Sequence, residues 1–392
     1  MRNTIIKYLS QFDLDVRKTR DARFSDQKCT PDVVCFIADC IVSSISEDTW
    51  FSVNDIWQSQ YFIKNVRAIY GKPWADDVRA KHEYNKFIQQ PLRMLAYAHI
   101  LDIEKGSPNK YRISNFDILE YISLKERNTY NFLYCYFEKV LKDSGQWRHF
   151  EQFIKEPNKD TFETLKERFD KFMIGFTPIN TAVEVHRIFP KILNVIAVEN
   201  NIQGTERGHI SKYAFSFSDL MYNHKNWRDL NKDKAISRQE AREAEDVEQQ
   251  EVFNNYYVQK AIALIRKIQT ESEVHDQYAQ GAATQVHHIF PKSKYPEIAH
   301  YLENLILLTA TQHFTQAHPN NNTQTINKDY QLTCLLAKAD TIKKSLQTVG
   351  DKYYRKESFV YVINTGLETS VFLTTESFED IKTKLIQFYN AA

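Results

Sequence analysis

The segment from residue 286 to residue 318 constrains the fold of this chain more than any other part of the sequence. It contains two short apolar runs, residues 286–290 and 305–309, each of a length typical of a single strand. Pro291 and Pro296 lie between the two runs, where proline keeps the connecting chain out of a β-ladder. The residues after the second run can form a short helix. The segment therefore predicts two strands, a loop between them and a helix.

Four polar side chains lie at the corners of this predicted unit: His287, His288, Asn304 and His313. Neighbouring strand residues point to opposite sides, so one histidine of the pair can face a metal ion and the other a water molecule. A neutral imidazole is a suitable base because its pKa lies near neutral pH. His313 can point back from the helix as a second ligand, and the Asn304 amide can bond across the loop. A base and a bound cation are what hydrolysis of a phosphodiester requires.

These four residues, with apolar strand residues between them, resemble the motif of the HNH, or ββα-metal, nuclease superfamily. The resemblance implies that His287 and His313 bind one divalent ion, usually Mg²⁺, for which Mn²⁺ can substitute. It also implies that His288 activates water and that Asn304 fixes the geometry of the loop. His318 is a possible additional ligand, because some members of the superfamily use a second histidine on this helix. Many members carry cysteine pairs for a structural zinc, and none is expected here.

Helical patterns dominate the rest of the sequence and predict an α+β, predominantly helical fold class. The predicted organisation is a basic N-terminal arm over residues 1–30, a winged-helix-like DNA-recognition domain over 31–125, a helical middle region with DNA-facing loops over 126–235, the HNH nuclease domain over 236–348, and a C-terminal β-hairpin and helix over 349–392.

The winged-helix-like region is predicted from three helical stretches, residues 31–45, 52–70 and about 76–98, followed by a turn and a strand near residue 111. Side chains that can contact phosphates or base edges gather around the third stretch and in the basic arm. The DNA-binding candidates, together with one lysine after the histidine pair, are Arg17, Arg20, Arg79, Lys81, Tyr84, Asn85, Lys86, Gln89 and Lys292.

Two further segments give predictions that the structure can test. Residues 186–191 repeat the pattern of residues 287–292, but no Asn and His follow them at the required distances. A long buried helix or strand is therefore expected there in place of a second nuclease motif. Residues 359–375 predict a β-hairpin, and a helix that Ser377 and Asp380 open is expected after it.

The composition is that of a soluble globular protein, with 42% apolar and 26% charged residues. The sequence contains no apolar run of the length that a membrane span requires, and its N-terminus lacks the apolar core of a signal peptide. We therefore expect a cytoplasmic protein. The five cysteines form no C-x-x-C pair, which argues against a disulfide scaffold. The net charge of +1 neither favours nor excludes nucleic acid.

The long, non-repetitive front half looks like a recognition apparatus, and the whole arrangement resembles a type II restriction endonuclease of the HNH class. That resemblance implies double-stranded DNA as substrate and a homodimer on a palindromic site. One alternative is a modification-dependent DNA endonuclease, in which an aromatic cage detects altered DNA; the candidates are Trp50, Trp57, Tyr61, Trp74 and Tyr84. Another is a non-catalytic DNA-binding regulator with a structural finger, although such a finger has no need of His288.

Overall fold

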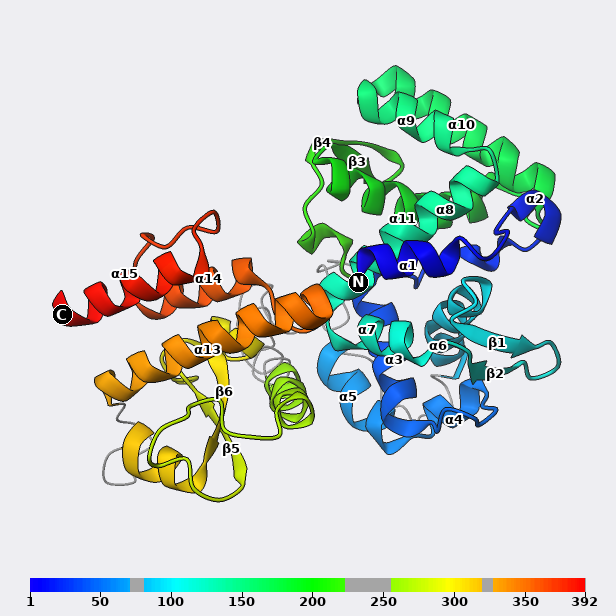
Figure 1. Ribbon diagram of the computed structural model, residues 1–392. Coiled ribbons are helices and arrows are strands. Elements are labelled where there is room, and N and C mark those ends of the chain that lie inside the picture. The colour runs from blue at the N-terminus through cyan, green and yellow to red at the C-terminus, as the bar shows by residue number, and fades with distance from the viewer. Residues whose placement is uncertain (71–80, 223–254, 319–326, 392) are drawn as a thin grey trace, which may run out of the picture. The chain divides into compact units, whose positions relative to one another are not determined.

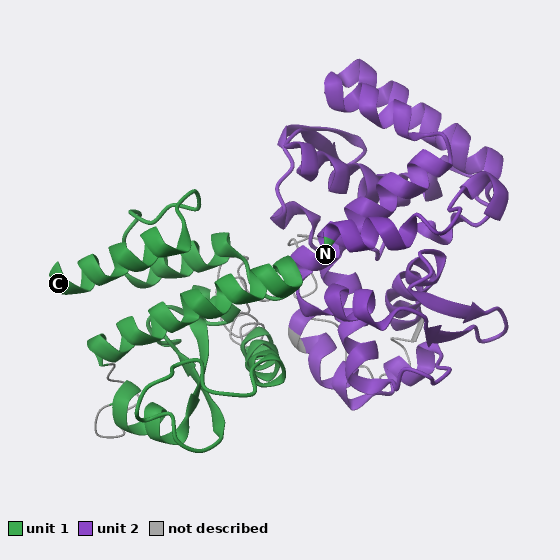
Figure 2. Cartoon of the chain, viewed as in Figure 1, with its two compact units in different colours: residues 1, 238–392 green, residues 2–237 purple. Residues whose placement is uncertain are grey.

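The computed structural model describes residues 1–70, 81–222, 255–318 and 327–391 (Figure 1). Helices make up most of these residues, and the strands among them form three two-stranded antiparallel sheets. The predicted α+β, predominantly helical class is therefore confirmed. The chain divides into two compact units (Figure 2). We call residues 2–237 the N-terminal unit, and residues 238–392 with Met1 the C-terminal unit.

The N-terminal unit begins with the segment that the sequence predicted as a basic arm, and that prediction is wrong. Helix α1 (Arg2–Leu9) buries Ile5 and Leu9 and packs against helix α8 (Glu126–Asp143). Helix α2 (Val16–Thr19) and the 3-10 turn η1 (Ala22–Phe24) follow it. Val16, Ala22 and Phe24 are also buried, and the burial of these apolar side chains ties the segment to the unit.

The next helices form the core of the N-terminal unit. Helix α3 (Pro31–Ser44) is buried along most of its length and packs against α7 (Phe116–Leu124) and α8. It begins at a proline, as predicted, because proline needs no hydrogen-bond partner in a first turn. Helices α4 (Val53–Trp57) and α5 (Gln60–Tyr70) come next along the chain.

Helix α6 (Lys81–Tyr97) is followed by a small hairpin in which β1 (Leu101–Glu104) pairs antiparallel with β2 (Lys110–Ile113). The register sets Leu101 opposite Ile113. The predicted strand is thus present, and its partner β1 was not foreseen from the sequence. Helices followed by a hairpin are the order of elements expected of a winged-helix-like region.

The remaining part of the N-terminal unit is a set of helices and one hairpin. Its elements are α9 (Trp147–Lys155), α10 (Lys159–Phe176), α11 (Ala182–Asn200), β3 (Gln203–Glu206), β4 (His209–Ala214) and the 3-10 turn η3 (Ser218–Leu220). Residues 186–191 lie inside α11, so their likeness to residues 287–292 does not reflect a second β-strand motif. After α11 the chain forms the β3–β4 hairpin, which turns at Gly208 with a φ of 85°.

The C-terminal unit contains the predicted histidine segment. Its described part starts with a helix over residues 255–268. Strands β5 (Ala283–His288) and β6 (Leu305–Thr309) pair antiparallel, and the π-helical turn η7 (Gln312–Ala317) follows β6. The predicted order of strand, loop, strand and helix is confirmed. The connecting loop contains two 3-10 turns, η5 (Pro296–Ile298) and η6 (Leu302–Asn304).

Three helices complete this unit: α13 (Lys328–Val349), α14 (Lys356–Gly366) and α15 (Phe378–Ala391), with the short turn η9 (Gly350–Lys352) between the first two. The predicted hairpin over residues 359–375 is wrong, because residues 356–366 are helical. The buried positions Phe359, Val360, Val362 and Ile363 follow the spacing of a helix face and not strand alternation. Helix α15 begins after Ser377, whose hydroxyl accepts a hydrogen bond from the Asp380 N–H, as predicted.

Among the described residues, no helix is both long enough and apolar enough to cross a membrane.

Candidate metal centre

The β5–β6 pair holds the first histidine of the site. His287 lies opposite Ile306 in the antiparallel register, and its side chain is 3% exposed. The other edge of β6 is held by Glu273, whose backbone N–H donates to the Leu307 carbonyl at 3.0 Å and whose carboxylate accepts from the Leu307 N–H at 2.9 Å. Both edges of β6 are therefore hydrogen-bonded, which stabilises the strand that pairs with β5 at His287.

The π-helical turn η7 brings two further histidines to the same place. The His318 N–H donates to the His313 carbonyl at 3.1 Å, a hydrogen bond that spans five residues. In a regular α-helix, with 3.6 residues per turn, positions five apart do not share a face. The wider π turn returns the chain to the same side after five residues, and turns of this kind are frequent at functional sites. The five-residue spacing thus suits two ligands in this turn.

His287, His313 and His318 form one cluster, in which the potential ligand nitrogens lie within 4.8 Å of one another. The ring centroids of His287 and His318 are 4.8 Å apart, as are those of His313 and His318. His313 Nδ1 is buried and has no hydrogen-bond partner among the described residues. A buried polar atom without a hydrogen-bond partner destabilises the folded protein unless a ligand binds to it. The cluster is therefore suited to a cation.

Burial favours the neutral form of two of these imidazoles, His287 and His313. It holds the pKa of His287 well below its usual value, with a further contribution from the neighbouring histidines. Burial also lowers the pKa of His313 to about 4, and the adjacent His318 acts in the same direction. A neutral imidazole has the free lone pair that a metal ion requires. His287 and His313 are thus ready to bind at neutral pH without first losing a proton.

The donor set bears on which ion fits. The resemblance implied Mg²⁺, an ion that prefers oxygen ligands and keeps several waters. Imidazole nitrogens suit first-row transition ions such as Zn²⁺ and Ni²⁺ better. Three imidazoles from β5 and η7 therefore fit a transition ion with open positions for water or substrate.

His288 lies beside this cluster with one nitrogen already engaged. Its Nε2 is 3.1 Å from the Ala299 carbonyl oxygen, which can only accept, so Nε2 carries the proton. The other ring nitrogen, Nδ1, is thereby left with the lone pair of a base. Burial lowers the pKa of His288 and outweighs the opposite effect of the Ala299 carbonyl. The ring is therefore neutral at neutral pH, and in this form Nδ1 can accept a proton.

A pocket of about 290 Å³ joins these groups. Its lining residues are Val286, His287, His288, Pro291, Lys292, Ser293, His313 and His318. Both histidines of the adjacent pair line it, although strand alternation predicted that they would face opposite sides. His288 is the last residue of β5, so the alternation does not separate it from the metal cluster. Lys292, a predicted DNA contact, extends its ammonium group to Asn255 at 2.6 Å.

Asn304 has the loop-bridging position that the sequence predicted. Its side-chain oxygen accepts from the Phe290 N–H at 2.8 Å, and its amide nitrogen donates to the carbonyls of Phe290 and Ile298 at 3.0 and 3.2 Å. The side chain is fully buried, so it does not reach the pocket. Asn304 therefore acts on the site by fixing the loop that carries the Ala299 carbonyl.

Two residues that the sequence did not single out also fix the site. Gln312 is buried at the start of η7, where its amide donates to Val274 O and Asp276 Oδ1 and accepts from Ser272 and from the Thr309 N–H. At Gly366, the last residue of α14, a Cβ atom would lie 2.3 Å from the Phe290 ring. The sequence shows a glycine near the end of an apolar run, but it does not show that this glycine packs against Phe290.

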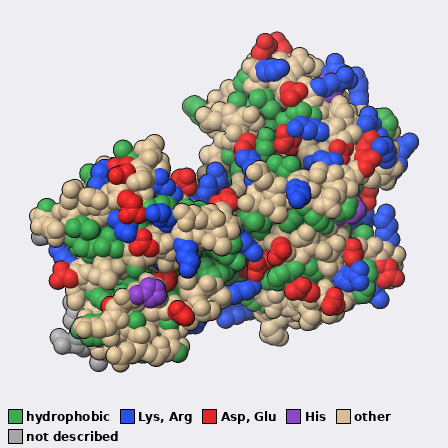
Figure 3. Space-filling model, viewed as in Figure 1, with side chains coloured by type: hydrophobic (Ala, Val, Ile, Leu, Met, Phe, Trp, Pro, Cys, Tyr) green, Lys and Arg blue, Asp and Glu red, His purple; other side chains and the backbone are tan. Residues whose placement is uncertain are grey.

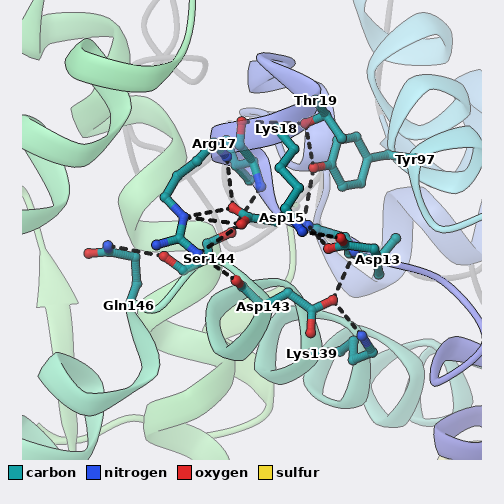
Figure 4. A network of polar contacts seen from close by, with 12 residues as sticks. Asp13, Asp15, Arg17, Lys18, Thr19, Tyr97, Lys139, Asp143, Ser144 and Gln146 are labelled. Carbon is teal, nitrogen blue, oxygen red and sulfur yellow. Dashed lines mark hydrogen bonds and ion pairs between the residues drawn. The ribbon is translucent and has the colours of Figure 1, made fainter.

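The DNA-binding candidates of the basic segment are mostly engaged within the protein. Arg17 pairs with Asp15 at 2.8 Å and donates to the Asp143 carbonyl, and Lys18 pairs with Asp13 (Figure 4). Arg20 is exposed and its guanidinium lies over the Phe176 ring. These cations bridge local elements of the N-terminal unit. Lys and Arg are also interspersed with Asp and Glu over the visible surface (Figure 3).

The candidates around α6 divide into three groups. Tyr84 is fully buried against Trp57 and Phe62, so its assignment as a DNA contact is wrong. Asn85 and Lys86 are exposed, and Gln89 is half-buried. Arg79 and the side chain of Lys81 lie outside the described residues.

The predicted aromatic cage is not supported by the positions of its members. Tyr84 belongs to the core, and the hydroxyl of the half-buried Tyr61 donates to Asp39 at 2.7 Å. Trp50 is exposed beneath the Arg112 guanidinium. Trp74 lies outside the described residues.

No protein-family model, no curated protein and no solved structure matches this chain.

Proposed function

We propose that this chain is a metal-dependent HNH endonuclease that hydrolyses phosphodiester bonds of double-stranded DNA at a short specific sequence, in the manner of a type II restriction endonuclease. The observation that carries the proposal is the combination in one pocket of a three-imidazole cluster and a separate histidine, His288, with its proton fixed on Nε2. Metal ligands alone would serve a structural site. A base beside them has a use only in a reaction.

His287, His313 and His318 would hold the divalent ion. The ion, when bound, supplies positive charge that stabilises the pentavalent phosphate and the leaving alkoxide. His288 Nδ1 accepts the proton of the attacking water while the Ala299 carbonyl holds the ring in place. Lys292 adds a positive charge at the mouth of the same pocket, where a substrate phosphate is expected.

His288→Ala is the direct test of the base. The variant should cleave DNA about 10² to 10⁴ times more slowly than the wild type, because general-base catalysis contributes a factor of that size. Its binding of metal and of DNA should be unchanged. Cleavage is measured on unmodified and methylated plasmid with Mg²⁺, Mn²⁺, Ni²⁺ or Zn²⁺. Near wild-type cleavage by the variant would contradict the assignment.

The look-alike segment in α11 offers a matched control. His186 occupies the position that corresponds to His287 in the repeated pattern, but it is exposed and bonds to Asp170 at 2.9 Å. His186→Ala should cleave like the wild type.

The cleavage pattern of the wild type separates the three candidate functions. Discrete fragments from unmodified plasmid support a restriction enzyme, and cleavage only of modified DNA indicates the modification-dependent alternative. No cleavage with any of the four ions supports the non-catalytic regulator.

The proposed homodimer follows from the palindromic site of the restriction class. Cleavage of both strands at symmetric positions, together with the mass of the chain in solution, tests it. A monomer that nicks one strand would contradict it.

A further inference from the structure

A second polar pocket, of about 230 Å³, lies in the N-terminal unit between α6 and the segment that follows η1. Its lining residues are Arg23, Asp26, Lys86, Gln89, Gln90 and Arg93. The four residues from α6 follow the spacing i, i+3, i+4 and i+7, so they share one face of that helix. The pocket is therefore built from one helix face and one neighbouring turn.

The chemistry of this pocket differs from that of a site for an apolar small molecule. Such sites are lined mostly by apolar and aromatic side chains, and among the described residues none of these lines this pocket. Three of its side chains carry positive charge and one carries negative charge. The carboxylate of Asp26 is paired with Arg23, and Asp21 pairs with Arg93 at 3.0 Å. These ion pairs hold the two guanidinium groups at the pocket.

Lys86 gives the pocket its net positive charge, because the two arginines are paired with aspartates. Its side chain is exposed, and no carboxylate among the described residues forms an ion pair with it. Gln90 accepts from the Lys28 N–H at 2.9 Å through its side-chain oxygen, which leaves its amide N–H groups as donors. Cations and amide donors around a small concave surface match a phosphodiester group, which presents acceptors only.

We propose that this pocket binds the phosphate backbone of the nucleic acid that the histidine site cuts. Lys86 is the charged contact, and Gln89, Gln90 and the guanidinium N–H groups of Arg23 and Arg93 are the hydrogen-bond donors. The inference rests on the proposed function for the identity of the polymer. It adds Arg23, Gln90 and Arg93 to the residues that the sequence nominated, and it gives the α6 face a role in positioning DNA.

The test measures binding without metal, so that its result is independent of cleavage. A labelled DNA duplex is titrated in EDTA with the full-length wild type, Lys86→Ala and Lys171→Ala, at several salt concentrations. Lys171 is the control because it is an exposed lysine on α10, 73% exposed and paired with Glu167 at 2.6 Å. Lys86→Ala should weaken binding about fivefold and reduce the slope of log K against log salt by about 0.9, the value for one phosphate contact.

The competing outcomes are distinct. Lys86→Ala and Lys171→Ala with equal affinities and slopes would overturn the inference, even if the wild type cleaves DNA. Inorganic phosphate that competes with the duplex at equal phosphate concentration would also overturn it, because the pocket would then be a free-anion site. Tighter binding to RNA of the same sequence, lost in Lys86→Ala, would overturn the assignment to DNA. Lys86→Arg, which keeps the charge, should bind like the wild type.

Discussion

The histidine pocket of the C-terminal unit and the ion-pair network around Asp15 in the N-terminal unit are both polar clusters, but their polar atoms are satisfied differently. In the network, each charged group has a partner of opposite charge or a carbonyl within the same unit (Figure 4). In the pocket, three imidazoles face one another and His313 Nδ1 has no partner among the described residues. A satisfied cluster holds a fold together, whereas an incomplete one is suited to a ligand.

The comparison shows why charge in a sequence is a weak indicator of binding. Residues 17–20 contain three cations and looked like part of a DNA-binding arm, yet Asp15 and Asp13 pair with Arg17 and Lys18. In the histidine pocket, burial lowers the pKa of His287 and His313, and the buried His313 Nδ1 without a partner is the stronger indication of a site. The predictions that follow test this difference, from the largest expected effect to the smallest.

Removal of a metal ligand should have the largest effect. His313→Ala should weaken binding of Zn²⁺ or Ni²⁺ more than about 100-fold, since even outer-shell partners of metal ligands contribute 10- to 100-fold. His318→Ala should do the same if the π turn makes it a full ligand. Isothermal titration calorimetry measures both. His275→Ala, a histidine of the same unit that is not part of the cluster, is the control, and equal affinities in all three variants would show that the cluster binds no metal.

Loss of the buried Lys338–Glu273 ion pair beside β6 should have the next largest effect, on the stability of the fold. Lys338 and Glu273 are 2.6 Å apart and almost fully buried, so Lys338→Met leaves an unpaired carboxylate in the core. The free energy of unfolding should fall by about 3 to 5 kcal/mol. Chemical denaturation measures it, and the double variant Lys338→Met/Glu273→Leu should recover part of the loss. A single variant as stable as the wild type would contradict this role of the pair.

Two glycine substitutions should separate close packing from backbone freedom. Gly366→Ala places a methyl group against the Phe290 ring and should lower stability by about 1 to 3 kcal/mol. Gly175→Ala, on α10, meets no atom within 4 Å and should raise stability by up to about 1 kcal/mol, because alanine favours the helix. Thermal unfolding followed by circular dichroism compares them. Equal shifts of the same sign would show that the Phe290 contact has no consequence.

The smallest effect is expected for a surface cation of the N-terminal segment. Lys18→Ala removes an exposed pair with Asp13, so stability should hardly change. DNA affinity in EDTA should not change, in contrast to Lys86→Ala. A loss of affinity as large as that of Lys86→Ala would restore the basic-arm interpretation that the structure argues against.

The sequence predicted the parts of the site that depend on local pattern. Apolar runs of strand length, the prolines between them and the identities of His287, His288, Asn304 and His313 placed the pocket on the correct elements. The bridging role of Asn304 was also foreseen, because this residue lies where the loop enters the second strand and its amide can bond across the loop. The pattern failed over residues 359–363, where an apolar run that looked like a strand forms a helix. A short apolar run fits either structure, and burial of its helical face decided between them.

Tertiary structure alone decided which of these groups meet. The Ala299 carbonyl that orients His288 is a backbone atom and leaves no trace in residue identity. The meeting of His313 and His318 depends on a π turn that Gln312 anchors through residues about forty positions away. Local sequence fixes backbone preferences and periodic burial, because these act over a few residues. Pairing of cations with aspartates, burial of imidazoles and the fit of Gly366 to Phe290 depend on segments that meet only when the chain is packed.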